Sequence, residues 1–103
     1  MAPRVVLVGA MGAGKTTVGE LVAQALEVGF RDTDHDIELA EGRSISDIFV
    51  DSGEEYFRTL ERAAVSLALL EHDGVLALGG GAVLSAETRA LLGQHQVVFL
   101  KVG

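Results

Sequence analysis

Short apolar runs recur along the chain, and stretches with helical spacing of apolar residues lie between them. The runs at residues 4–8, 75–78 and 97–102 are rich in Val and Leu, and we expect them to form buried strands. A shorter, mixed run at residues 28–31 contains a turn glycine and predicts a brief further strand. Because strands and helices alternate without a repeat or a linker, the pattern predicts an α/β fold, with a parallel sheet between layers of helices.

The first helical patterns follow the first strand. One apolar face is expected up to about residue 27, made of Val18, Leu21, Val22, Ala25 and Leu26. Residues 36–41 are predicted to form a helix that ends at Gly42. Ser44 has the spacing of an N-cap for a short helix containing Ile48 and Phe49.

The later helices show similar start and stop signals. Ser52, three residues before Glu55, is expected to cap a long helix that continues to about His72. Its predicted apolar stripe consists of Phe57, Leu60, Ala64, Leu67 and Leu70. Ser85 is expected to cap a last helix, which ends at Gly93.

Composition narrows the class of protein. The 103 residues are 49% hydrophobic, which is enough for one folded domain. The formal net charge of −7 leaves no basic stripe for nucleic acid. The chain has no cysteine, no apolar run of membrane-spanning length and no recognisable leader before the first strand. We therefore expect a cytoplasmic protein that binds neither nucleic acid nor membrane.

A glycine-rich loop after the first strand carries the clearest chemical signal. Residues 9–17 have two glycines bracketing four residues, followed by Lys and Thr. In such a loop, backbone N–H groups of Gly12, Ala13 and Gly14 face a phosphate, and the helix that begins near Thr17 adds its dipole. Lys15 would reach the β- and γ-phosphates of ATP, and the Thr16 hydroxyl would join the Mg²⁺ shell. The alternative is a glycine-rich surface turn.

Asp32 and Asp34 follow the second predicted strand at alternate positions. If the chain stays extended there, both carboxylates face the same side, near the phosphate loop. One could hold Mg²⁺ through water while the other receives a substrate hydroxyl. In the alternative interpretation, Asp34 caps the next helix and Asp32 is a solvated turn residue.

Two further features are ambiguous from the residues alone. The third predicted strand, residues 75–78, is followed by Gly79, Gly80 and Gly81. Close approach of the backbone to a ligand would explain these glycines, and so would a plain turn. Arg58 lies four residues after Glu54 and three before Glu61, a spacing that is ordinary for pairs on a helix surface. The three histidines lack metal-ligand spacing, and we expect them at the surface.

Taken together, these residues resemble the shikimate kinase family. The similar segments are residues 9–17, 32–34, 42–49, 53–61 and 78–81, in this order along the chain. The resemblance implies a P-loop kinase fold of the nucleoside-monophosphate-kinase type over residues 1–103, with shikimate-binding helices at about 34–62. It also implies transfer of the ATP γ-phosphoryl group to the 3-hydroxyl of shikimate.

The resemblance assigns roles to residues that match the family pattern. Lys15 would stabilise the transferring phosphoryl group, and Thr16 with Asp32 would hold Mg²⁺. Asp34 would bind the shikimate hydroxyls and act as the base, and Arg58, oriented by Glu61, would bind the carboxylate. The backbone of Gly79, Gly80 and Gly81 would pack against the ring, with Phe49 and Phe57 as walls of the pocket.

The chain differs from the family in length. Members of the family continue into a lid with arginines, a fifth strand and a loop that holds adenine, so the sheet is expected to stop after its fourth strand. The family's strand order, 2-3-1-4-5, would leave the fourth strand as an open apolar edge that could promote self-association of an otherwise monomeric protein. Two other functions stay open, a non-catalytic nucleotide- or phosphate-binding fragment and a related carbohydrate kinase such as gluconate kinase.

Overall fold

A computed structural model describes residues 3–9 and 14–100 of the chain. Its four strands are β1 (Val5–Gly9), β2 (Phe30–Asp32), β3 (Val75–Gly79) and β4 (Val97–Phe99). They pair in parallel, in the order β2-β3-β1-β4. The parallel sheet and the edge position of the fourth strand agree with the prediction.

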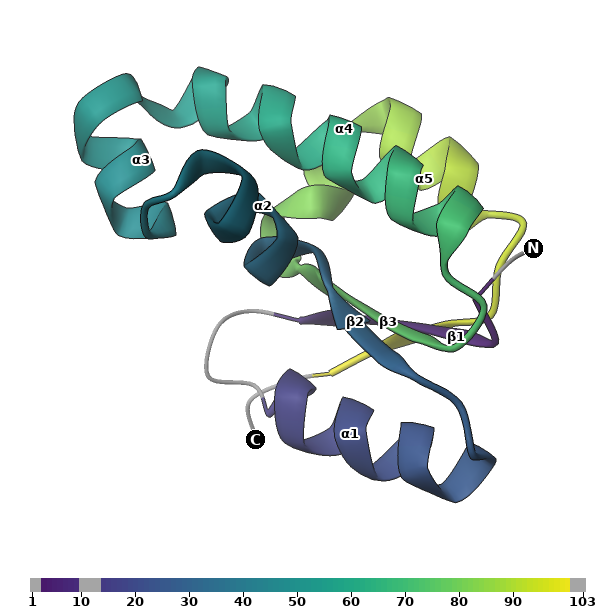
Figure 1. Cartoon of the computed structure of the whole chain (residues 1–103). Helices are drawn as coiled ribbons and strands as arrows, with labels where there is room; N and C mark the ends of the chain where they lie inside the picture. The colour runs from purple at the N-terminus through teal and green to yellow at the C-terminus, as the bar shows by residue number, and fades with distance from the viewer. Residues whose placement is uncertain (1–2, 10–13, 101–103) are drawn as a thin grey trace.

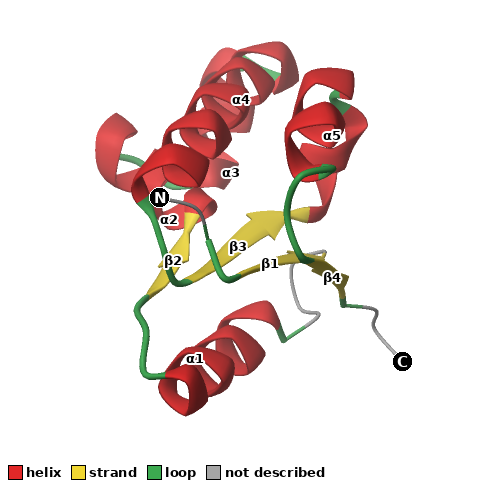
Figure 2. Cartoon of the chain, turned by 90° about the vertical axis from the view of Figure 1, so that its right-hand side faces the viewer, coloured by secondary structure: helices red, strands yellow, loops and turns green. Residues whose placement is uncertain are grey.

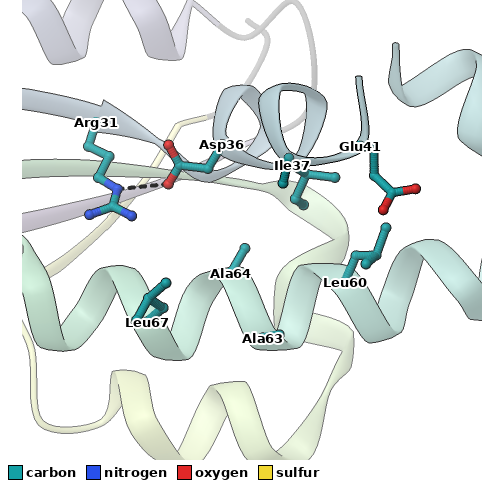
Figure 3. A pocket seen from close by; sticks show the side chains of 9 residues that line it. Arg31, Asp36, Ile37, Glu41, Leu60, Ala63, Ala64 and Leu67 are labelled. Atoms are coloured by element: carbon teal, nitrogen blue, oxygen red, sulfur yellow. Dashed lines mark hydrogen bonds and ion pairs between the residues drawn. The ribbon is translucent and has the colours of Figure 1, made fainter. Parts of the chain in front are cut away.

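Helices cover both faces of this sheet (Figure 1). One helix, α1 (Lys15–Leu26), lies against one face. On the other side lie α2 (Thr33–Glu41), α3 (Ile45–Ser52), α4 (Glu54–Glu71) and α5 (Ala86–Leu92). A short 3₁₀ helix, η1 (Gly80–Leu84), connects β3 to α5. Figure 2 shows the resulting three layers edge-on, which confirms the predicted α/β/α arrangement.

The two central strands are buried on both faces, as their continuous apolar sequences predict. Alternate side chains serve opposite layers because successive residues of a strand point to opposite faces. Val6 and Leu76 pack with Val65 and other residues of α4 and α5. Leu7 and Val75 pack with α1.

A separate apolar cluster joins α2, α3 and α4. It consists of Ile37, Ile48 and Phe57, each 4% exposed or less. Full burial of one such side chain contributes about 1.5–3 kcal/mol. Ile48 is the one buried residue of α3, and the partly buried Ile45 and Phe49 of the same helix pack against the cluster.

Several helix signals are confirmed. The Ser44 hydroxyl accepts a hydrogen bond from the Asp47 amide at 3.1 Å, and the Ser85 hydroxyl accepts one from the Thr88 amide at 3.3 Å. Gly42 ends α2 with φ of 70°. However, α2 begins at Thr33, ahead of the expected residue 36, because Asp32 caps it.

The prediction that Ser52 caps the long helix is wrong. Ser52 is the last residue of α3, and Gly53 alone separates it from α4. Gly53 has φ of 87°, a conformation that favours glycine, and this turn places the helix boundary one residue later. The Ser52 hydroxyl accepts instead from Arg43.

The expected apolar stripe of the long helix is partly wrong. Leu67 and Leu70 are 51% and 73% exposed, whereas Val65, Ala68 and Leu69 are buried. The reason is that α4 packs first against α2 and α3 and then over the sheet, so its buried face rotates along its length.

The buried face of α1 also differs from the predicted one. Leu21 and Leu26 are 61% and 42% exposed, and Ala25 is also exposed. The buried residues near the sheet include Gly19, where an added Cβ would overlap the ring of Phe30.

The last strand is shorter than the predicted run. β4 ends at Phe99, and residues 101–103 lie outside the described part of the chain. Val98 and Phe99 are 39% and 60% exposed at this edge of the sheet. No helix within residues 3–9 and 14–100 is long and apolar enough to cross a membrane.

Candidate active site

The predicted site residues gather at the carboxyl ends of three strands. Gly9 ends β1, Asp32 ends β2 and Gly79 ends β3. In a parallel sheet these ends share one edge, which is where open α/β sheets bind ligands. The predicted site therefore draws on segments far apart in sequence.

Of the phosphate loop, Gly9 and the residues from Gly14 onward are described, and Gly12 and Ala13 lie outside the described part. Gly14 has φ of 83° and precedes α1. Lys15, the first residue of the helix, is 7% exposed, whereas Thr17 is exposed. A buried lysine is costly unless an anion is near it, so this position suits a phosphate.

Thr16 and Asp32 line the same pocket, which has a volume of about 400 Å³. A hydroxyl and a carboxylate are oxygen ligands of the type that Mg²⁺ prefers. Among the described residues, no three His, Cys, Asp or Glu side chains form a metal-binding group. The expected magnesium site would therefore use these two residues, with water and phosphate oxygens completing the shell.

The turn from β2 into α2 fixes the two aspartates. Asp32 Oδ1 accepts a hydrogen bond from the Asp34 amide at 2.9 Å, so Asp32, and not Asp34, is the N-cap of α2. The alternative in which Asp34 caps the helix is thereby wrong. Between them, the fully buried Thr33 donates its hydroxyl proton to the carbonyl of Ala77 in β3 at 3.4 Å. The cap leaves the Asp34 carboxylate directed to the site.

The Asp34 carboxylate lies beside Gly79. A Cβ added to Gly79 would lie 3.2 Å from Asp34 Oδ2, closer than most Cβ contacts in proteins. Burial, followed by the charge of Asp32, raises the pKa of Asp34 to about 6, although nearby Lys15 lowers it. A carboxyl with this pKa is still mainly ionised at pH 7 and can accept a proton.

One open pocket of about 330 Å³ contains the residues predicted to bind the acceptor. Its lining is Asp34, Ile45, Phe49, Phe57, Arg58, Glu61, Gly79, Gly80 and Gly81. The resemblance named all of them except Ile45, which the sequence analysis missed. The missed signal is helical spacing, because Ile45 lies four residues before Phe49 and thus on the same face of α3.

Arg58 is held over the aromatic wall of this pocket. Its Nη1 donates to Glu61 Oε1 at 2.9 Å, and its guanidinium lies 5.3 Å from the ring centre of Phe57 and 6.0 Å from that of Phe49. Glu61 is 4% exposed, so Arg58 and Glu61 are not an ordinary ion pair on the helix surface. A Cβ added to Gly81 would overlap the Arg58 guanidinium. The glycine thus leaves the space in which Arg58 lies.

The histidines do not belong to this pocket. His72 lies between β2 and β3, where Nε2 is 3.2 Å from the carbonyl oxygen of Gly29 and 3.0 Å from that of Val75. His95 is half-buried. His35 is exposed and lines the pocket shared by Thr16 and Asp32.

Comparison with known proteins places these observations in context. A family model described as shikimate kinase matches residues 11–103. A shikimate kinase from Streptomyces avermitilis is 66% identical over 100 residues, which are 97% of this chain and 58% of that protein. One from Frankia casuarinae is 67% identical over 99 residues, 96% of this chain and 44% of that protein. The chain thus spans about half the length of these curated relatives.

Solved structures give the same result. The chain superposes on a shikimate kinase from Acinetobacter baumannii, a complex with shikimate, with a TM-score of 0.91 and 42% identity. This match covers 100% of this chain and 57% of that one. A gluconokinase from Sinorhizobium meliloti is similar at a TM-score of 0.50 and 20% identity, which shows a shared fold alone. On the family match and these identities, the chain belongs to the shikimate kinase family.

Proposed function

We propose that the protein transfers the γ-phosphoryl group of ATP to the 3-hydroxyl of shikimate, and that residues 1–103 supply its phosphate loop and acceptor pocket. The observation that carries the proposal is one pocket in which Asp34 and Arg58 meet beside Gly79, Gly80 and Gly81. A polyol with a carboxylate needs one hydroxyl acceptor and one fixed cation. Asp34 and Arg58 provide this pair.

Arg58 would bind the carboxylate of the acceptor. Its planar guanidinium can donate two parallel hydrogen bonds to a carboxylate, and Glu61 restricts its orientation. Phe49 and Phe57 would contact the ring. The hydroxyl groups would face Asp34, which lines the same pocket.

The transfer step follows from this orientation. The 3-hydroxyl oxygen of shikimate forms a bond to the γ-phosphorus of ATP while the bond from that phosphorus to the β-phosphate oxygen breaks, giving ADP. The hydroxyl proton passes to the Asp34 carboxylate. Lys15 would stabilise the negative charge on the transferring oxygens.

Fewer of the described residues would bind Mg²⁺ and ATP than would bind the acceptor. Mg²⁺ bound to ATP would neutralise phosphate charge, with Thr16 as a ligand and Asp32 bound through water. Asp32 suits this role because only its Oδ1 is needed as the cap of α2. The backbone N–H groups at the start of α1 would face the phosphates.

The test is shikimate-dependent formation of ADP by the 103-residue chain with MgATP, beside calorimetric titration of shikimate. Turnover supports the proposal outright. Shikimate binding without turnover supports the acceptor site and assigns the remaining chemistry to segments beyond these residues.

Two outcomes oppose the proposal. A folded chain that shows neither turnover nor shikimate binding would leave the non-catalytic nucleotide- or phosphate-binding fragment as the better description. Turnover with gluconate in place of shikimate would assign the site to a carbohydrate kinase. Folding is checked by far-ultraviolet circular dichroism before either conclusion is drawn.

A further inference from the structure

The helix that carries part of the acceptor pocket, α3, is held by apolar contacts in its first half and by polar contacts at its end. Ile48 is its one buried side chain, and Ile45 and Phe49, which line the pocket, pack against the same apolar cluster. At its start, the Ile45 amide donates to Glu38 Oε2 at 2.9 Å. The apolar contacts of α3 all come from residues 45–49, and Val50 is 84% exposed, so the end of the helix depends on polar contacts.

Arg43 supplies those contacts from the loop before α3. Its Nη2 donates to Glu41 Oε1 at 2.9 Å and to the Ser52 hydroxyl at 3.0 Å, and its Nη1 donates to Asp51 Oδ2 at 3.4 Å. Glu41 ends α2, and Asp51 and Ser52 end α3. One side chain thus connects the end of one helix with the end of the next.

Tyr56 extends the connection to α4. The Arg43 guanidinium lies 5.7 Å from the centre of the Tyr56 ring, and the Tyr56 hydroxyl donates to the Glu41 carboxylate at 3.1 Å. The side chains of Arg43 and Glu41 are only 25% and 18% exposed. A planar guanidinium that stacks and donates to three groups is better fixed than an isolated surface ion pair.

We propose that Arg43 is a positioning residue, which sets acceptor affinity by holding the end of α3 against α2 and α4. The inference rests on the proposed function for its acceptor. Arg43 itself does not line the pocket. It acts through α3, because any displacement of this helix moves Phe49 relative to Arg58.

The first test needs no substrate. Amide hydrogen exchange is compared between the wild type, Arg43→Ala and the control Arg62→Ala, in which an exposed arginine of α4 loses its hydrogen bond to Thr59. In Arg43→Ala, amides at the end of α3, including that of Gly53, should exchange about fivefold faster or more, while α1 stays unchanged. Equal exchange at the end of α3 in all three proteins would overturn the proposal.

The second test measures binding by calorimetry. Arg43→Ala should weaken shikimate binding about three- to tenfold and leave the affinity for MgADP unchanged, with Arg43→Lys between it and the wild type. A general loss of structure would instead weaken both ligands together. Unchanged shikimate affinity, or equal loss of both ligands, would overturn the proposal.

The two tests separate the two inferences. If the folded wild type binds no shikimate, the proposed function fails, and the role of Arg43 in acceptor binding fails with it. Hydrogen exchange then decides whether Arg43 holds α3. If the wild type binds shikimate and Arg43→Ala binds it equally well, only the role of Arg43 is overturned.

Discussion

Asp34→Asn should make the protein more stable at neutral pH while abolishing turnover. The half-buried Asp34 carboxyl lies beside Gly79, and the charges of Asp32 and Lys15 both act on it. Its ionised form is disfavoured by burial and by the neighbouring carboxylate, which together raise its pKa from 3.8 to about 6. Asparagine has nearly the same shape and carries no charge. The substitution therefore removes the destabilising charge.

The sign of the pH dependence follows from proton binding. Between pH 3.8 and about 6 the native state holds the Asp34 proton more tightly than the unfolded state does. The free energy of unfolding therefore decreases as the pH rises through this window, and the loss is complete above pH 6. A pKa raised this far corresponds to about 3 kcal/mol. Because solvent reaches part of the carboxylate and screens it, we expect about 1–2 kcal/mol.

The assay is urea unfolding of the wild type and Asp34→Asn at several pH values from 4 to 7. The variant should match the wild type near pH 4 and exceed it by about 1–2 kcal/mol at pH 7. Asp73→Asn is the control, since it makes the same change in net charge at an exposed position before β3. Parallel pH profiles for the wild type and Asp34→Asn would refute the reasoning, as would a variant less stable at pH 7.

Four other substitutions test separate parts of the structure. Arg58→Ala should weaken acceptor binding by roughly 2–5 kcal/mol and spare nucleotide, as measured by calorimetry, and equal loss of both ligands would make Arg58 structural. Lys15→Ala should lower the turnover number by about 100-fold or more with little change in shikimate affinity, and an unchanged turnover number would remove Lys15 from the mechanism. Gly81→Ala should displace the Arg58 guanidinium and weaken shikimate binding about tenfold without loss of stability; wild-type affinity would show that Arg58 tolerates the methyl group. Ile48→Ala should lower the free energy of unfolding by about 2–5 kcal/mol in urea, and a loss under about 1 kcal/mol would contradict the importance of the cluster of α2, α3 and α4.

The sequence predicted the start of a helix correctly where one local hydrogen bond, that of the N-cap, determines it. The caps Ser44 and Ser85 each form the expected hydrogen bond, because a serine hydroxyl at the start of a helix satisfies an amide that has no other partner. Ser52 has the same spacing but does not cap, because it ends α3 and Gly53, with φ of 87°, forms the turn into the next helix. A turn that joins two helices depends on how they pack, and that information is not local.

Apolar periodicity predicted the helices but not their buried faces. Leu67 and Leu70 extend the apolar stripe of α4 and are nevertheless exposed, while Glu61 on the same helix is buried. A helix that packs against different partners along its length has no single buried face. The spacing of apolar residues therefore predicts that a helix forms, whereas its orientation is set by tertiary contacts.

The roles of Arg58 and Glu61 in the acceptor pocket were predicted from the resemblance to the family and not from the spacing of the residues. Spacing alone made Arg58 and Glu61 an ordinary pair on a helix surface, because sequence does not say which side of α4 faces the carboxyl end of β3. In the folded chain Glu61 is buried beside the glycines that follow β3. In the same pocket, burial raises the pKa of the Asp34 carboxyl, so the ionised form of Asp34 opposes stability. That cost to the fold is a physical argument that Asp34 serves a ligand.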